Sequence, residues 1–437
     1  MSEDKEKIEP YLKIYHNRSL LVDDKNKEEI FYEGKPSERA LKRLEKIKDS
    51  LKQGFLESLI TTCKKSYTPP KLTDQQISTI EKLVSSITSE YGRAVVGLTI
   101  LQLSIKAIDP TQNIRLHKAG RGDFSWTDGV PMRSLDAELV APVLRSTNLL
   151  KYNKFGVMMT RSLAENYPYT KFYKAAIRGP KDTWLELVDM LEKQEINPLE
   201  ALKVIIYNLI NRSEVFQHLV NETMELMNEQ LRKGLTKQQV VKLIKSHVYN
   251  SGHPARLFEI AMHSLFQALE EQNVLCGRLR PLSQMRCANK KFGNIGDIEL
   301  LAGLEGSSEI IEAWDAKYGK NYLFDELGEL EDKLPNHKSI RRLGFVIDSE
   351  AQTSEEIEQR KVEIVEMFGI NVEILTFDDW TDEQFTRSKK NPDQTATDWF
   401  RAYVESICLK RLNAAPIDEP AESWVRGMKD ILSNSKL

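Results

Sequence analysis

The fold of this chain is decided by the stretch GNIGDIELLAGL (293–304) and, a few residues later, IEAWDAKYGK (311–320). Both segments contain short apolar runs beside glycines, a pattern typical of buried strands. Two further runs of this kind follow, RRLGFVID (341–348) and NVEILTF (371–377), with the helical pattern SEEIEQRKVEIVEMFG (354–369) between them. Strands that alternate with helices in this way predict an α/β plan with a mixed sheet.

Three of the charged residues in the first two of these runs form a candidate site. Asp297 lies near the start of the first run, and Asp315 and Lys317 lie two residues apart in the second. Because residues i and i+2 of a strand point to the same face, we expect Asp315 and Lys317 to share a face, with Ala316 on the other. If the two strands are adjacent, Asp297 and Asp315 lie within reach of one cation.

These side chains suit the hydrolysis of a phosphodiester. Mg²⁺ takes oxygen ligands, usually one or two carboxylates together with waters and phosphate oxygens. The cation lowers the pKa of a bound water and stabilises the charge of the transition state. A nearby lysine orients the attacking water and stabilises negative charge. The pattern therefore predicts a magnesium site at Asp297 and Asp315, with Lys317 beside it.

A third carboxylate is suggested by Glu259, within the amphipathic helical pattern HPARLFEIAMHSLFQAL (253–269). Its neighbours are mostly apolar, and a carboxylate in such surroundings is costly unless it is paired or binds a cation. The alternative is that Glu259 belongs to the polar stripe of the helix. Glu299 shares a face with Asp297 and is another candidate ligand or supporting group. The residues leave open which of the two glutamates completes the site.

The order of these elements, from about Gly252 to Trp380, resembles the core of the PD-(D/E)XK nucleases, which is the core of most type II restriction endonucleases. The resemblance implies a restriction-endonuclease-like mixed sheet flanked by helices. It further implies that Asp297 is the first acidic ligand, Asp315 the (D/E) residue and Lys317 the catalytic lysine. Glu259 matches the acidic residue often found on the first helix of the family.

One residue departs from the family's pattern, because Gly296 rather than proline precedes Asp297. The motif is then an aspartate, a gap and D-x-K. The order of the predicted strands and helices around the motif is what supports the resemblance to the family. The alternative interpretation of the same letters is a surface strand with alternating charges.

The chain ahead of this core is mainly helical in pattern. Residues 1–72, rich in Lys and Glu, predict a charged and partly helical N-terminal arm that ends at the prolines of SYTPPKL. Residues 73–250 carry apolar residues at helical spacing and predict a DNA-recognition region. Residues 251–437 are then the predicted nuclease domain.

The composition is that of a globular protein, with 41% hydrophobic and 29% charged residues. A formal net charge of −3 does not by itself indicate a nucleic-acid-binding protein, so local clusters must carry that prediction. No apolar run approaches the ~18–20 residues that span a bilayer. The four cysteines lack zinc-ligand spacing. We expect a cytoplasmic protein with reduced thiols and no contact with membrane.

A basic segment, CGRLRPLSQMRCANKK (276–291), leads directly into the strand with Asp297 and contains no acidic residue. Cations beside a metal site would neutralise phosphates near the scissile bond. The predicted contacts are Arg278, Arg280, Arg286, Lys290 and Lys291. The alternative is a solvated basic loop.

A second basic cluster spans 145–178 and interleaves cations with aromatic rings. Such a mixture suits contact with the DNA backbone and with bases. The predicted contacts are Lys151, Lys154 and Arg161, together with Arg121 and Arg133 from the loop just upstream. The aromatic residues are equally good candidates for an ordinary core.

Together with these patterns, the resemblance implies a Mg²⁺-dependent, sequence-specific endonuclease of double-stranded DNA, the type II restriction enzyme of a restriction–modification system. The resemblance implies a homodimer, because a two-fold axis matches a palindromic site. Two alternatives stay open. One is another PD-(D/E)XK nuclease that acts in repair, in transposition or on RNA. The other is a DNA-binding regulator without catalytic activity, in which the D-x-K tripeptide is accidental.

Overall fold

The computed structural model describes residues 9–66, 68, 70–87, 90–120, 124–150, 156–159, 161–282, 294–303, 309–319, 323–348, 354–410 and 420–434. The chain divides between Val215 and Phe216 into two compact units. This division differs from the boundary that we expected at residue 250. The second half of α8 (Pro198–Lys233) and the whole of α9 (Lys237–Asn250) bury apolar side chains in the core of the second unit.

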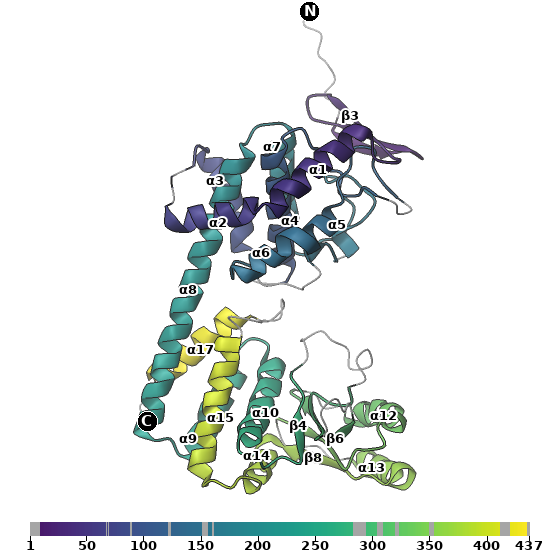
Figure 1. Cartoon of the computed structure of the whole chain (residues 1–437). Helices are drawn as coiled ribbons and strands as arrows, with labels where there is room; N and C mark the ends of the chain where they lie inside the picture. The colour runs from purple at the N-terminus through teal and green to yellow at the C-terminus, as the bar shows by residue number, and fades with distance from the viewer. Residues whose placement is uncertain are drawn as a thin grey trace, which may run out of the picture. The chain divides into compact units, whose positions relative to one another are not determined.

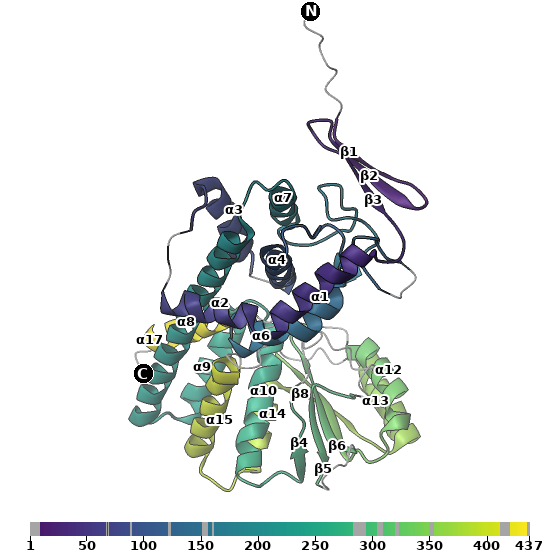
Figure 2. The ribbon, with the colours of Figure 1, turned by 45° about the horizontal axis from the view of Figure 1, so that its top comes forward.

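The first unit begins with a three-stranded antiparallel sheet, where the sequence analysis expected a solvated arm. Its strands are β1 (Tyr11–Ile14), β2 (Arg18–Val22) and β3 (Glu28–Tyr32), joined in chain order (Figure 2). One face of the sheet packs Leu21 and Phe31 against Leu116 and Trp126. The sequence did not predict this alternation of buried and exposed positions, because the many charged residues around the strands indicated a charged arm.

Helices make up most of the first unit (Figure 1). They are α1 (Glu38–Lys52), α2 (Phe55–Lys65), α3 (Asp74–Ser85), α4 (Glu90–Ile108), α5 (Met132–Leu135), α6 (Ala141–Ser146), α7 (Lys181–Glu192) and the first half of α8, with a π-helical turn at Asp136–Val140 and 3₁₀ turns at Val157–Met159 and Arg161–Leu163. The start of α3 is fixed by a capping box between Thr73 and Gln76. Apolar residues lie all around α4, which places it in the centre of this core.

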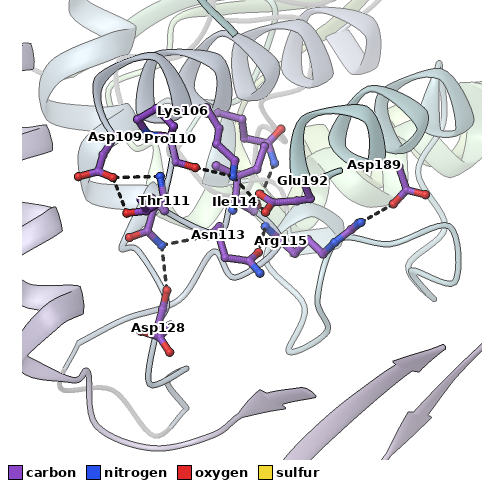
Figure 3. Close-up of polar contacts among 12 residues, drawn as sticks. Lys106, Asp109, Pro110, Thr111, Asn113, Ile114, Arg115, Asp128, Asp189 and Glu192 are labelled. Carbon is purple, nitrogen blue, oxygen red and sulfur yellow. Dashed lines mark hydrogen bonds and ion pairs between the residues drawn. The ribbon is translucent and has the colours of Figure 1, made fainter. Parts of the chain in front are cut away.

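A polar network ties the sheet of the first unit to its helices. The buried Arg115 donates to the carbonyl oxygen of Tyr169 at 2.9 Å. It also pairs with Asp189 of α7 at 2.6 Å, as Figure 3 shows. Asn113 reaches Glu29 of β3 at 2.9 Å. A pocket of about 200 Å³ adjoins these groups. Because its buried cation and carboxylates neutralise one another, we assign the network to holding β3 against the helical core.

The second unit contains a five-stranded mixed sheet in the order β4-β5-β6-β7-β8. The strands are β4 (Gly277–Leu279), β5 (Ile298–Ala302), β6 (Ile310–Lys317), β7 (Arg342–Ile347) and β8 (Val372–Thr376). The pairs β4/β5 and β5/β6 are antiparallel, whereas β6/β7 and β7/β8 are parallel. The parallel strands are linked through α12 (Leu323–Lys333) and α13 (Glu355–Phe368). The predicted mixed sheet with flanking helices is thus confirmed.

Two apolar layers cover the two faces of this sheet. On one face, α12 and α13 pack on Ala313, Leu343 and Phe345. On the other, Trp314 and Val346 pack on the core formed by α9, α10 (Pro254–Glu271), α14 (Phe377–Thr386), α15 (Pro392–Ile407) and α17 (Ala421–Asn434). In the part of the chain that the structure describes, no helix combines the length and the apolar character needed to cross a membrane.

Candidate metal and phosphodiester site

The antiparallel pairing of β5 with β6 brings the two predicted aspartates together. Ile298 lies opposite Trp314 in the ladder, and just before it the backbone N–H of Asp297 donates to the carbonyl oxygen of Trp314 at 3.0 Å. The Oδ2 of Asp297 accepts the backbone N–H of Ala316 at 3.0 Å. The carboxyl group of Asp297 also shares a hydrogen bond with that of Asp315. The strand register therefore fixes both side chains at one point on the sheet.

The two carboxyl groups are held in different states of protonation. Burial, followed by the charges of Asp315 and Glu259, raises the pKa of Asp297 well above its usual value. Burial alone would also raise the pKa of Asp315, but the hydrogen bond from Asp297 and the charge of Lys317 together lower it. Two carboxyl groups that share one proton carry about one negative charge. Such a pair suits a cation, which can replace the proton.

Lys317 lies beside the aspartate pair, on the same face of β6 as Asp315. Its Nζ is 2.8 Å from Oδ2 of Asp315 and 2.7 Å from Oε2 of Glu326, at the start of α12. Burial opposes the charged form, but the two carboxylates outweigh it and raise the pKa of Lys317. Ala316 packs on the opposite side of the sheet, so the predicted alternation of faces is confirmed. Lys317 is therefore held as a cation with its head group fixed.

Glu326 is the residue of this site that the sequence analysis missed. It lies nine residues beyond Lys317 and in a different element, and it follows no spacing rule that links a helix to a strand. The signal in the sequence was limited to an acidic first turn, Asp325 and Glu326, in a helix that follows the D-x-K strand. Acidic first turns are common in helices because they complement the helix dipole, so this signal is weak.

The two candidate glutamates occupy different places. Glu299 accepts the backbone N–H groups of Ile295 and Gly296 at 2.7 and 3.2 Å and pairs with Arg280 at 2.7 Å. It therefore shapes the turn that presents Asp297. Glu259, on α10, pairs with the buried Arg256, and its charge contributes to the raised pKa of Asp297. Of the two, Glu259 is the carboxylate that acts electrostatically on the aspartate pair.

The geometry of the turn before β5 explains why position 296 is a glycine and not the proline that the expected PD-(D/E)XK motif would place there. A Cβ at Gly296 would lie 2.8 Å from the carbonyl oxygen and 3.0 Å from the carbonyl carbon of Trp314. The N–H of Gly296 also donates to Glu299, and proline has no N–H to donate. The close approach of this turn to β6 requires a residue without a side chain.

The fit of the site to a divalent cation rests on the aspartate pair. Among the residues that the structure describes, no three side chains of His, Cys, Asp or Glu form a ready-made cluster of metal ligands. Mg²⁺ needs no such cluster, since it usually binds through one or two carboxylates and keeps several waters. The hydrogen-bonded pair Asp297 and Asp315, with Glu259 in its neighbourhood, is a donor set of that kind.

The first basic cluster is described in part. Arg278, on the edge strand β4, is exposed, while Arg280 is half-buried and bound to Glu299. Arg280 thus has a structural partner and is not a free phosphate contact. The predictions for Arg286, Lys290 and Lys291 lie outside the described residues.

The second basic cluster is divided between surface and core. Arg161 is almost fully exposed, and Arg133 is exposed on α5. The rings of Tyr169 and Tyr173 are buried against Trp184, so these aromatic residues belong to the core. The predictions for Arg121, Lys151 and Lys154 lie outside the described residues.

No model of a protein family matches the chain, and a search of curated proteins finds no similar sequence. The function of the protein is therefore inferred from the geometry of the site.

Proposed function

We propose that this protein is a Mg²⁺-dependent endonuclease of double-stranded DNA with a PD-(D/E)XK-type site, of the type II restriction kind. The observation that carries the proposal is the meeting of Asp297, Asp315 and Lys317 at the junction of β5 and β6. Two hydrogen-bonded carboxyl groups with a fixed lysine beside them match the requirements of phosphodiester hydrolysis. An accidental D-x-K on a surface strand would not explain why Asp315 and Lys317 are buried.

Each residue of the site has a chemical task in this mechanism. Asp297 and Asp315 would hold the cation through their carboxylate oxygens, with Asp297 giving up its proton when the cation binds. A bound Mg²⁺ supplies an acidified water and neutralises charge on the phosphate oxygens. Lys317, fixed between Asp315 and Glu326, donates from Nζ to the attacking water or to a phosphate oxygen. The water oxygen would then bond to phosphorus and lose one proton to solvent. The bond from phosphorus to the leaving oxygen would break, and that oxygen would take up a proton from solvent.

The proposal is tested by incubating the purified full-length chain with phage DNA and Mg²⁺ and sequencing the ends of the products. A sequence-specific endonuclease gives discrete fragments with a common sequence at their ends. Scattered ends would favour a nuclease of the same superfamily with another role. DNA binding without cleavage by the wild-type protein would favour the non-catalytic regulator.

Two variants test the assignment of residues. Asp297→Ala and Lys317→Ala should each abolish cleavage and leave DNA binding largely intact, because neither is assigned to the surface that holds DNA. The matched control is Lys338→Ala, which removes an exposed lysine elsewhere in the second unit. Cleavage retained in both site variants would refute the proposed active site.

A further inference from the structure

The outward face of the small sheet in the first unit bears a patch for which the proposed active site has no use. The strand register places eight side chains on this face. Val22 is buried and Glu28 lies opposite it at one end of the face. We define the patch by the other six residues: Tyr11, Lys13, Arg18, Leu20, Ile30 and Tyr32. Arg18 lies directly opposite Tyr32, and Leu20 lies opposite both Lys13 and Ile30. The other face of the sheet is the one that packs on Trp126.

Large apolar and aromatic side chains are unusually exposed in this patch. Tyr32 is 54% exposed, Ile30 43% and Tyr11 40%. These three are among only twelve large hydrophobic residues that are exposed in the described part of the chain, and they gather on one small sheet. Exposed apolar residues that occur singly need no explanation, but a contiguous group marks an interaction surface.

The charge of the patch indicates the kind of partner. The strands β1 and β2 and their turn, YLKIYHNRSLLV (11–22), contain Lys13, His16 and Arg18 but no acidic residue. The third strand adds one carboxylate to this face, Glu28, at the end opposite Val22 and away from Arg18. The cationic groups of Lys13 and Arg18 lie 5.3 and 4.7 Å from the centre of the Tyr15 ring. Within the described residues neither cation forms an ion pair with a carboxylate. Two cations held over an aromatic ring, beside exposed tyrosines, are complementary to a polyanion.

We propose that the outward face of β1–β3 binds duplex DNA, with Lys13 and Arg18 on phosphates and the tyrosines against sugars or base edges. The inference rests on the proposed function for the choice of duplex DNA among polyanions. An antiparallel β-ribbon fits the major groove of B-DNA. The network around Arg115, Asn113 and Glu29 anchors β3 to the helical core, so the sheet is held as a rigid element.

The test measures binding by the full-length chain to a fluorescent pool of short random-sequence duplexes, in EDTA and at several salt concentrations. The test variant is the double substitution Lys13→Gln/Arg18→Gln. The control is Lys42→Gln/Lys52→Gln, which removes the same charge from exposed positions of α1. Loss of two phosphate contacts should weaken binding roughly tenfold and make the slope of log K against log salt shallower by about 1.8.

A second variant, Tyr32→Ser, should weaken binding with little change in the salt slope, because it removes an uncharged contact. Equal binding by the double variant and the wild type, or equal loss in the control, would overturn the inference. So would failure of the wild type to bind duplexes, or tighter binding to single strands, RNA or anionic vesicles. Since no divalent cation is present, these results do not depend on cleavage. A protein that binds through this face but never cuts DNA would refute only the proposed nuclease.

Discussion

The Oε2 of Glu326, on α12, lies 2.7 Å from the Nζ of Lys317, on β6, and holds the head group of that lysine in place. The ammonium group is also 2.8 Å from Asp315. With two carboxylates as partners, it has little rotational freedom. Preorganised donors of this kind contribute to catalysis because they need not reorganise during the reaction.

Substitution of Glu326 by glutamine should therefore lower the rate of cleavage without a matching loss of DNA binding. We expect kcat to fall roughly tenfold, equivalent to about 1.4 kcal/mol, and KM for DNA to change little. Glu329→Gln, at an exposed position of the same helix, is the control. If Glu326→Gln raised KM while kcat stayed constant, Glu326 would act on binding and not on the position of Lys317.

The protonated carboxyl group of Asp297 should make the metal-free protein less stable than a neutral amide at this position would. Asp297→Asn keeps an oxygen to accept the N–H of Ala316 and removes the carboxyl group whose pKa is raised by burial and by the charges of Asp315 and Glu259. We expect it to stabilise the metal-free protein at neutral pH, because the wild type holds the Asp297 proton in the folded state and releases it in the unfolded state.

The same substitution should abolish the stabilisation by Mg²⁺. At a hundredfold excess over its Kd, a ligand that binds only the folded state stabilises it by about 2.7 kcal/mol. Melting temperatures of wild type and Asp297→Asn, with and without Mg²⁺, provide the measurement. Asp332→Asn, at an exposed position of α12, should leave both values as in the wild type. An unchanged response of Asp297→Asn to Mg²⁺ would place the cation elsewhere.

The strand residues of the candidate site could be predicted from sequence because strand geometry is local. The two-residue period of β6 places Asp315 and Lys317 on one face whatever the tertiary context. The proximity of Asp297 required only that β5 and β6 be neighbours, as sequential strands often are. Glu326 could not be predicted, because its position depends on how α12 packs on the sheet.

The N-terminal sheet could not be predicted for a related reason. In residues 11–32 the buried face amounts to a few residues such as Ser19, Leu21 and Phe31, and charged residues separate β2 from β3. Composition favoured a solvated arm. The side chains at these positions are buried because they pack against Trp126, which lies far along the chain. Contacts of this kind are non-local and leave no periodic signal in the strand itself.

Asp136 should make the stability of the first unit depend on pH. Its Oδ2 accepts the N–H groups of Val157 and Met158 at 2.6 and 3.1 Å, while Oδ1 is buried without a hydrogen-bond partner among the described residues. Burial outweighs these two hydrogen bonds and raises the pKa of Asp136 from 3.8 to about 6. The folded state thus binds this proton more tightly than the unfolded state.

The contribution of Asp136 to stability is present below pH 4 and is lost as the pH rises from about 4 to 6. The loss is of the order of 3 kcal/mol. Asp136→Asn, which stays neutral, should therefore gain stability relative to the wild type over this interval, as measured by calorimetric melting at a series of pH values. Asp49→Asn, at an exposed position of α1, should show no such trend. A constant difference between Asp136→Asn and the wild type would contradict the raised pKa.

Gly296 offers a test of how closely the two strands must approach for activity. A Cβ at this position would lie within 3.2 Å of the N, C and O atoms of Trp314, and backbone atoms cannot turn aside as a flexible side chain can. Gly296→Ala should therefore push the turn away from β6 and separate Asp297 from Asp315. We expect a loss of about 1–3 kcal/mol in stability, typical of overpacking, together with weaker binding of Mg²⁺.

The matched substitution is Gly328→Ala in α12, where an added Cβ meets nothing within 4 Å. Alanine favours a helix over glycine by about 1 kcal/mol, so this variant should be at least as stable as the wild type and fully active. Titration of Gly296→Ala with Mg²⁺, well below the melting temperature of the variant, distinguishes a destabilised turn from a displaced pair of aspartates. Normal Mg²⁺ affinity in a destabilised variant would mean that the aspartates keep their positions, and that Gly296 serves the packing of the turn and not the cation site.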